Sequence, residues 1–308
     1  MWAHSGTDHR PIAGRRMTDP AKLSIVIPAK NEAESLGQLL QSIRAQFISA
    51  EIIVVNDGSQ DNTADVCKAN GALVLSHPYS MGNGAAIKSG VRSAKGEIVV
   101  CMDADGQHDP ADITRLLAKL DEGFDMAVGA RGTESQANVG RSLANRLYNK
   151  LASWMVGHHI ADLTSGFRAA RTEKFREFLH LLPNGFSYPT TITMAFFRAG
   201  YPVAYVPIRA HERTGKSHIR PLQDGMRFLL IIFRVGTLYS PLKIFVPISL
   251  GFFLLALSYY SFTYITERRL TNMTGLLFTT SVVVFLIGLV SEQITNLLYT
   301  LGRNGRER

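Results

Sequence analysis

The chain has little cysteine: only Cys67 and Cys101 occur among its 308 residues. One lies in a predicted helix and the other in a predicted strand, so they form neither a disulfide framework nor a zinc site. The first twenty residues also lack the apolar core of a secretory signal. These absences favour a reduced compartment and predict a flexible tail over residues 1–20.

Long uncharged apolar runs are missing from the first two hundred residues but occur twice near the C-terminus. Residues 244–266 and 270–291 contain no charged side chain. At a rise of 1.5 Å per residue, each run spans roughly 33 Å, enough to cross the core of a bilayer. We therefore expect transmembrane helices at 244–266 and 270–299, with two buried helices of a soluble domain as the alternative.

Charge around these runs predicts their orientation. One flank has Arg227, Arg234, Lys243, Arg303, Arg306 and Arg308, whereas the intervening turn has Glu267, Arg268 and Arg269. The positive-inside rule then places the preceding domain and a tail at 300–308 in the cytoplasm. Residues 222–243 mix apolar and basic side chains, which predicts an interfacial helix on the membrane surface.

Residues 21–221 show the alternation of an α/β domain. Short apolar runs occur at 23–28, 51–56, 73–75, 97–102 and 126–130, and the first is followed by leucines and an isoleucine at helical spacing. Such runs indicate strands buried on both faces of a mostly parallel sheet. Ligands bind such sheets at the carboxyl ends of the strands, so chemistry is expected just after each run.

Acidic residues follow the fourth run at this edge. Asp103 and Asp105 flank Ala104, and the two-residue repeat of an extended chain turns both carboxylates to one side. Two carboxylates together with substrate phosphate oxygens suit Mg²⁺ or Mn²⁺. Gln107 is a further candidate ligand, directly or through water. An acidic turn with no ligand is the alternative.

Asp57 follows the second run in the turn Asp57-Gly58-Ser59. Its carboxylate could accept hydrogen bonds from a nucleobase or ribose, or it could only shape the turn. For Asp61 and Asn62 we expect capping of the next helix.

Four ordered segments, SIVIPAKNEAESL, VVNDGSQDNTADV, MGNGAAIKSG and DADGQHDP, resemble the signatures of family 2 glycosyltransferases with a GT-A fold. Two further segments, DLTSGFR at 162–168 and RTGKSHIRP at 213–221, resemble the branch that transfers sugars to dolichyl or undecaprenyl phosphate. The resemblance covers the chain from Leu23 to its end.

This resemblance implies a role for individual residues. It implies nucleotide-sugar contacts from Pro28, Lys30, Glu32, Asp57 and Ala104, metal ligation by Asp103, Asp105 and Gln107, and phosphate contact by Arg131. Simpler roles remain open for two of them, because Glu32 could serve the first turn of a helix and Lys30 could be solvated.

The basic segment before the apolar runs departs from the family pattern. The family has Arg three residues before the Gly and Lys after the Ser, whereas this chain has Glu212 and His218. Arg213, Lys216 and His218 are therefore the candidates for contact with the acceptor phosphate. A basic patch that only meets the membrane surface is the alternative.

A second departure concerns the acceptor. Many relatives have an acidic residue after the SGFR segment, but this chain has GFSYPTTITMAFF. A hydroxyl acceptor needs a general base, whereas a phosphate monoester with a second pKa near ~6 is already largely ionised. The missing base therefore favours a lipid-phosphate acceptor, a polyprenyl phosphate, over a hydroxyl. We expect no nucleic-acid partner, although the net charge of +8 alone fits nucleic acid, an anionic membrane surface or a phosphate-bearing substrate.

We thus expect an inverting, metal-dependent enzyme that transfers one sugar from a UDP- or GDP-sugar to a polyprenyl phosphate. The alternatives are a membrane polysaccharide synthase and a non-catalytic nucleotide-sugar-binding scaffold. Synthases have a Gln-x-x-Arg-Trp motif, and neither Trp2 nor Trp154 lies in one. The sequence does not determine the oligomeric state, and a homo-oligomer is one alternative. Glu292, near the end of the second apolar run, reaches the interface or pairs with a nearby arginine such as Arg303 or Arg234. The alternative is that it fixes the hairpin against the juxtamembrane helix and so positions the lipid entrance.

Overall fold

The computed structural model describes residues 22–131, 139–185, 187–209, 233, 236–237 and 239–304. The described residues form two compact units. The first lies within residues 1–150 and 159–217, and the second within 151–158 and 218–308. The tail expected at 1–20 and most of the interfacial helix expected at 222–243 lie outside the described residues.

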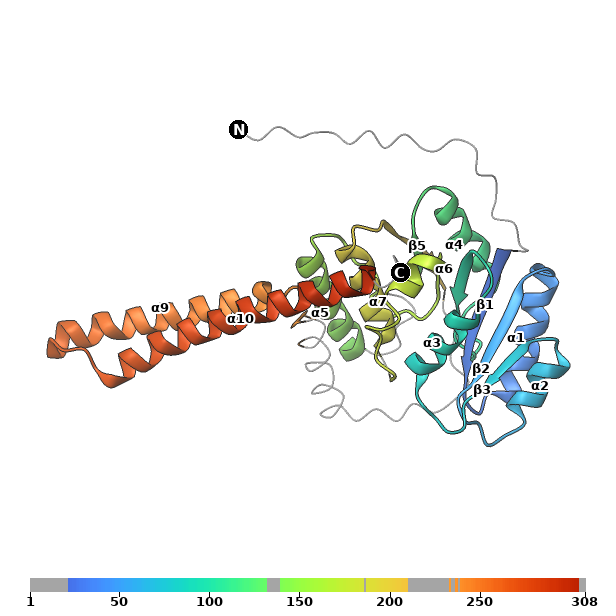
Figure 1. Cartoon of the computed structure of the whole chain (residues 1–308), viewed down its shortest axis with the longest axis horizontal. Coiled ribbons are helices and arrows are strands. Elements are labelled where there is room, and N and C mark those ends of the chain that lie inside the picture. Colours follow the sequence, from blue (N-terminus) through green and yellow to red (C-terminus); the bar gives the residue numbers. More distant parts are fainter. Residues whose placement is uncertain are drawn as a thin grey trace. The chain divides into compact units, whose positions relative to one another are not determined.

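A seven-stranded sheet forms the centre of the first unit, with the strand order β3-β2-β1-β4-β6-β5-β7 (Figure 1). Its strands are β1 (Leu23–Ala29), β2 (Glu51–Asn56), β3 (Leu73–Ser76), β4 (Ile98–Cys101), β5 (Met126–Arg131), β6 (Arg168–Arg171) and β7 (Val203–Ile208). Only β6 runs antiparallel to its neighbours β4 and β5, and the other pairs are parallel. The expected mostly parallel α/β sheet is confirmed.

Helices cover both faces of this sheet. They are α1 (Ala33–Gln46), α2 (Thr63–Ala69), α3 (Asn83–Ser93), α4 (Asp112–Asp121), α6 (Thr172–Glu177) and α7 (Tyr188–Arg198). Another helix, α5 (Val139–Val156), follows β5 in the chain. Helix α1 buries Leu36, Leu39, Leu40 and Ile43 in one cluster with Ile25 and Ile27 of β1. On the other face, α3 comes close at Gly90, whose Cα lies against Val26 and Val55. The central strands are therefore buried on both sides.

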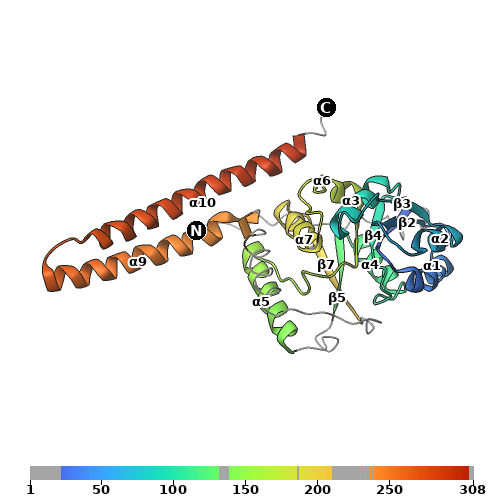
Figure 2. The same cartoon turned by 90° about the horizontal axis from the view of Figure 1, so that it is seen from below.

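The second unit consists mainly of two long helices, α9 (Pro241–Glu267) and α10 (Asn272–Asn304), which lie side by side (Figure 2). The stretches Pro241–Thr266 and Asn272–Leu298 have mean hydropathies of 1.9 and 2.2 and are long and apolar enough to cross a membrane. Their apolar side chains are mostly exposed. This exposure is unlike that of core helices in a soluble domain.

Polar groups between the two helices satisfy one another. Ser249 Oγ donates to the Ser281 carbonyl and Ser281 Oγ donates to the Ser249 carbonyl, both at 2.9 Å. Gly288 allows close approach, because a Cβ there would lie 2.6 Å from Cβ of Phe245. These contacts are typical of helix pairs in lipid, where small residues and hydroxyl groups hold the interface together.

Charged side chains meet helix ends at the base of the hairpin. The Glu292 carboxylate accepts from the backbone N–H of Leu242 (3.5 Å), in the first turn of α9. Lys243 Nζ donates to the carbonyl of Met155 (2.8 Å), in the last turn of α5. Each charge has the sign that the macrodipole of its helix end favours.

Candidate active site

The carboxyl ends of β1, β2, β4 and β5 place most of the predicted site residues at one edge of the sheet. Pro28 lies in β1, and Lys30 and Glu32 follow it; Asp57 follows β2; Asp103, Ala104, Asp105 and Gln107 follow β4; and Arg131 ends β5. These strands are mutually parallel or linked through the antiparallel β6. The sheet therefore brings together side chains that are about a hundred residues apart in sequence.

Asp57 holds the loop that precedes α3. One carboxylate oxygen accepts from His77 Nδ1 (2.7 Å) and the Met81 N–H (2.8 Å). The other accepts from Ser80 Oγ (2.8 Å) and the Gly82 N–H (2.9 Å). Burial opposes ionisation, but these four hydrogen bonds outweigh it and lower the pKa of Asp57. Its carboxylate is thus an ionised anchor for residues 77–82.

The MGNG segment needs its glycines for close backbone approach. Gly82 has a positive φ of 101°, and a Cβ there would lie 2.6 Å from the Asn184 carbonyl oxygen. The next residues of α3 donate to the loop 184–185, with Gly84 N–H reaching Gly185 O (3.2 Å) and Ala85 N–H reaching Asn184 O (2.9 Å). The segment therefore fixes two loops beside the site.

Residues after β1 contact both of the neighbouring strand ends. Lys30 Nζ donates to Ser80 Oγ (3.1 Å) in the loop held by Asp57. Ser35 Oγ lies 3.1 Å from the Glu32 carboxylate and 2.9 Å from the Ala104 carbonyl oxygen. The start of α1 is thereby joined to the Asp-Ala-Asp segment.

The prediction that Asp61 and Asn62 cap the helix after β2, which is α2, is half right. Asp61 accepts from the N–H groups of Thr63 (3.1 Å) and Ala33 (3.2 Å), so it serves the first residues of both α2 and α1. Asn62 occupies the N-cap position of α2, but its side chain makes no capping hydrogen bond. That part of the prediction was wrong, because Asp61 already binds the first N–H of the helix.

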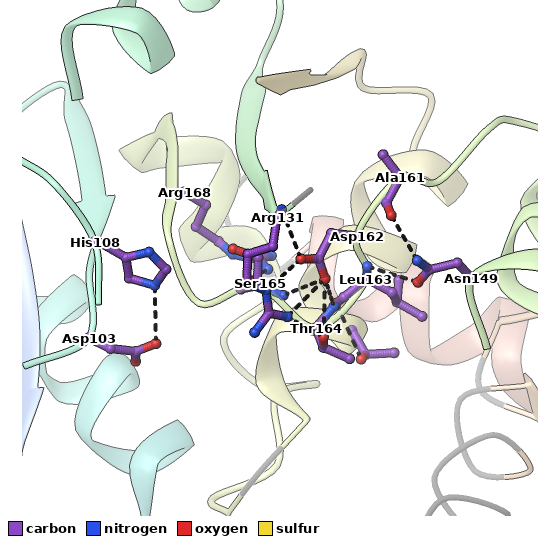
Figure 3. Close-up of polar contacts among 11 residues, drawn as sticks. Asp103, His108, Arg131, Asn149, Ala161, Asp162, Leu163, Thr164, Ser165 and Arg168 are labelled. Carbon is purple, nitrogen blue, oxygen red and sulfur yellow. Dashed lines mark hydrogen bonds and ion pairs between the residues drawn. The ribbon is translucent and has the colours of Figure 1, made fainter. Parts of the chain in front are cut away.

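Asp103 lies partly exposed between two neighbours, His108 and Gly166 (Figure 3). The imidazole Nε2 of His108 lies 3.7 Å from Asp103 Oδ2. Gly166 is close on another side, since a Cβ there would lie 2.6 Å from the same oxygen. The His108 ring stacks on Phe167 with centroids 5.0 Å apart and planes inclined by 19°.

The second aspartate closes its own turn. Asp105 Oδ1 accepts from the backbone N–H of Gln107 (3.2 Å), across Gly106 with its positive φ of 71°. In the described ranges, no group of three or more His, Cys, Asp or Glu side chains is arranged to hold a metal. Mg²⁺ with nucleotide substrates, however, usually uses one or two carboxylates plus phosphate oxygens. Asp103 and Asp105 provide hard oxygen donors of that kind.

Arg131 is held by Asp162 in a bidentate ion pair (Figure 3). Its Nε lies 2.8 Å from Asp162 Oδ2 and its Nη2 lies 3.1 Å from Oδ1, while Nη2 also donates to Thr164 Oγ1 (2.7 Å). Burial opposes the charge on Arg131, but Asp162 first, and then the charges of Asp103 and Asp105, raise its pKa. Arg131 therefore lies within electrostatic reach of both aspartates.

The Asp162 carboxylate has further donors. The N–H groups of Thr164 (3.0 Å) and Ser165 (3.1 Å) bind the same oxygen. Burial raises the pKa of Asp162, but the hydrogen bonds and charge of Arg131 and these N–H groups outweigh it, so the pKa is lowered. Asp162 is therefore a fixed anion and a poor proton acceptor.

Arg168 is completely buried beneath this edge of the sheet. Its Nη1 donates to the Pro189 carbonyl and to Thr193 Oγ1, both at 3.0 Å, and its guanidinium lies 5.7 Å from the Tyr188 ring centroid. Its Nε has no hydrogen-bond partner, and no acidic side chain in the described part of the chain pairs with it. Its charge is solvated by carbonyl and hydroxyl oxygens of α7.

Three of these residues, His108, Asp162 and Arg168, were not predicted as site residues. All three lie within the segments DADGQHDP and DLTSGFR, so the family-like segments were the signal that could have identified them. Conversely, Arg213, Lys216 and His218 lie outside the described residues, and their acceptor role stays a prediction.

Comparison with known proteins identifies the group of enzymes to which this site belongs. Residues 24–179, half of the chain, match the family model of glycosyl transferase family 2. The chain belongs to this family. Residues 240–297 match a second model, the GtrB C-terminal hairpin. That match covers most of α9 and α10.

Several relatives are similar over much of the chain. Glycosyltransferase AglJ of Haloferax volcanii is 26% identical over 91% of this chain and 96% of its own length. A dolichyl-phosphate hexose transferase of the same organism is 30% identical over 66% of this chain and 89% of its own. An undecaprenyl-phosphate 4-deoxy-4-formamido-L-arabinose transferase of Proteus mirabilis is 35% identical, over 49% of each chain.

Solved structures support the same assignment. Glucosyl-3-phosphoglycerate synthase of Mycobacterium tuberculosis, in complex with Mn²⁺, UDP and phosphoglyceric acid, has a TM-score of 0.56 and 25% identity, covering 73% of this chain and 84% of its own. The chain is a glycosyltransferase, and the expected GT-A architecture is confirmed.

Proposed function

We propose that this glycosyltransferase moves one sugar from a UDP- or GDP-sugar to the phosphate of a polyprenyl lipid, undecaprenyl or dolichyl phosphate. Its similarity to two transferases named for such lipids supports this acceptor. The two helices long and apolar enough to cross a membrane support it too, because they would bring the enzyme to a lipid substrate.

The structural observation that supports this proposal is that neither Asp162 nor α7 supplies a free carboxylate to act as a base. Asp162 is bound by Arg131 and by backbone N–H groups, and α7 contains no acidic residue. A hydroxyl acceptor would need a free base to take its proton. A lipid phosphate is already ionised near neutral pH and needs only positioning and charge neutralisation.

In the proposed reaction, an oxygen of the lipid phosphate attacks the anomeric carbon of the donor. The bond from that carbon to the diphosphate oxygen breaks, and a nucleoside diphosphate leaves. The configuration at the anomeric carbon is therefore inverted. Electrostatic stabilisation and proximity provide most of the rate enhancement. The positive charge of Arg131 is placed to meet donor or acceptor phosphate.

We assign the nucleotide to the edge formed by Pro28, Lys30, Glu32, Asp57 and Ala104. Asp57 acts there through the loop 77–82, which it holds in place. Asp103 and Asp105, with Gln107 as a further candidate, would hold Mg²⁺ or Mn²⁺. When bound, that ion would neutralise charge on the departing diphosphate. The partly exposed Asp103 carboxylate, with only hydrogen at Gly166 beside it, fits such an ion.

We place the acceptor phosphate at Arg213, Lys216 and His218. The basic residues around the two apolar runs favour a cytoplasmic position for residues 21–221, with two spans at 244–266 and 270–299. Residues 222–243 would then lie at the interface and residues 300–308 in the cytoplasm.

The proposal can be tested with membranes that contain the full chain. They are incubated with each of several radiolabelled UDP- and GDP-sugars and with undecaprenyl or dolichyl phosphate, and the lipid is extracted. We expect label in the lipid phase, and we expect Asp105→Ala to lower transfer at least about 100-fold because a metal ligand is lost. Asp121→Ala, an exposed change on α4, is the matched control. Transfer to a glycan hydroxyl instead would contradict the proposed acceptor.

A further inference from the structure

The Asp103 carboxylate is bordered by two segments that are far apart in sequence. His108 follows it in the same turn, and Gly166 and Phe167 come from the segment before β6. Gly166 leaves room for the carboxylate where any Cβ would lie 2.6 Å from Oδ2. Phe167 is fully buried and supports the face of the His108 ring. The segments DADGQHDP and DLTSGFR therefore meet around one carboxylate.

The two ring nitrogens of His108 have different surroundings. Its side chain is only 4% exposed, and its Nδ1 is buried with no hydrogen-bond partner. A proton on Nδ1 would be a buried donor without an acceptor, whereas a proton on Nε2 points toward the Asp103 carboxylate 3.7 Å away. The Nε2 side of the ring therefore faces the Asp103 carboxylate, and the Nδ1 side faces no acceptor.

We infer that His108 is a positioning residue for Asp103: stacked on Phe167, its Nε2 faces Oδ2 at 3.7 Å and would restrain the carboxylate so that the other oxygen is left to bind a divalent cation. This inference rests on the proposed metal site. Groups that hydrogen-bond to a ligand fix its orientation, and their loss typically weakens metal affinity by ~10- to 100-fold. Without the contact from His108, the Asp103 side chain would be free to rotate, because it is 34% exposed.

The alternative is that His108 only fills space over Phe167. Two substitutions separate these roles. His108→Phe keeps a flat ring for stacking but removes the donor, whereas His108→Gln keeps an N–H donor near the Nε2 position and loses the stacked ring. A packing role predicts that the Gln variant is the more damaged, and a positioning role predicts the reverse for metal affinity.

The test measures Mn²⁺ binding, independently of activity. Purified full-length wild type, His108→Phe, His108→Gln and Asp103→Asn are titrated with Mn²⁺ alone, and free Mn²⁺ is followed by electron paramagnetic resonance. We expect the Kd to rise about tenfold in His108→Phe and by less than about threefold in His108→Gln. The metal-free melting temperature of each variant reports whether it is folded.

The outcomes separate the role of His108 from the proposed metal site on which that role depends. Wild-type affinity in His108→Phe, or an equal loss in His108→Gln, would overturn the positioning role. If Asp103→Asn also binds Mn²⁺ like the wild type, the metal site itself is wrong. A loss in Asp103→Asn with no loss in His108→Phe would reject only the role of His108.

Discussion

Arg131 lies within electrostatic range of Asp103 and Asp105, and its guanidinium is already oriented. Asp162 accepts from Nε and Nη2, and none of the described residues accepts from Nη1. A bidentate pair of this kind fixes the plane of the guanidinium and removes rotamer entropy before a substrate arrives. In the proposed reaction, the remaining N–H groups would bind a phosphate at little further cost in entropy.

This pair predicts a dependence of stability on pH. The folded-state pKa of Asp162 lies below the ordinary value of 3.8, so its ionised form stabilises the folded chain. The contribution is complete above about pH 4 and is lost as pH falls through the lower folded-state pKa. Asp162→Asn should lower the free energy of unfolding at pH 7 by about 3 kcal/mol, because it leaves a largely buried Arg131 without its counter-charge.

Thermal or denaturant unfolding at pH 7, and at steps from pH 5 to pH 3, checks this prediction. The difference between wild type and Asp162→Asn should shrink as the wild type approaches pH 3. Asp121→Asn, an exposed change, should unfold like the wild type throughout. A difference that stays constant down to pH 3 would show that the charge of Asp162 does not matter.

At the scale of elements, contacts at helix ends hold the base of the helical hairpin. Glu292 accepts from the first turn of α9, and Thr295 Oγ1 donates to the Thr237 carbonyl (3.1 Å). The role of Glu292 in fixing the hairpin stays a prediction, and this contact lies at the place where that role would act. The carboxylate also favours the positive end of the α9 dipole.

If the hairpin base positions the lipid entrance, Glu292→Gln should impair long acceptors selectively. The amide keeps a carbonyl acceptor but loses the charge, worth about 1 kcal/mol at a helix end. We expect transfer to a long polyprenyl phosphate to fall about fivefold, and transfer to a short, water-soluble analogue to change little.

Initial rates with the two acceptors at equal donor concentration provide the measurement. Thr280→Ala, whose hydroxyl bonds only within α10, is the control on the same helix. Parallel losses with both acceptors would leave Glu292 as an ordinary interfacial residue.

At the scale of the whole molecule, the proposed topology puts the turn after α9 and the sheet domain on opposite sides of the membrane. Native cysteines should not interfere with a labelling test, because Cys67 and Cys101 are fully buried and burial raises their pKa values to about 11 and about 12. Leu270→Cys, 66% exposed, and Ile48→Cys, 79% exposed, each introduce an accessible thiol.

A membrane-impermeant maleimide applied to intact cells should label Leu270→Cys and spare Ile48→Cys. Permeabilised cells should show both labelled, and the wild type should stay unlabelled. Labelling of Ile48→Cys in intact cells would place the catalytic domain outside.

Local patterns were sufficient to predict the strands and helices with strong periodicity. Runs such as 23–28 and 51–56 are mostly apolar because both faces of those strands are covered, and the spacing from Leu36 to Ile43 matches one buried helix face. Strands β6 and β7 were not predicted. β6 is a four-residue strand with arginine at each end, and β7 contains Pro207, so neither has a strong strand pattern.

The sequence by itself determined that Asp57, Asp103 and Arg131 share one edge of the sheet, because each comes at the end of an apolar strand and parallel strands put those ends together. Tertiary structure decided what each side chain does. Asp57 binds a loop twenty residues later, Arg131 pairs with Asp162, and His108 stacks on Phe167. The last two of these partnerships follow from the pairing of β6 between β4 and β5, a long-range contact that no local periodicity encodes.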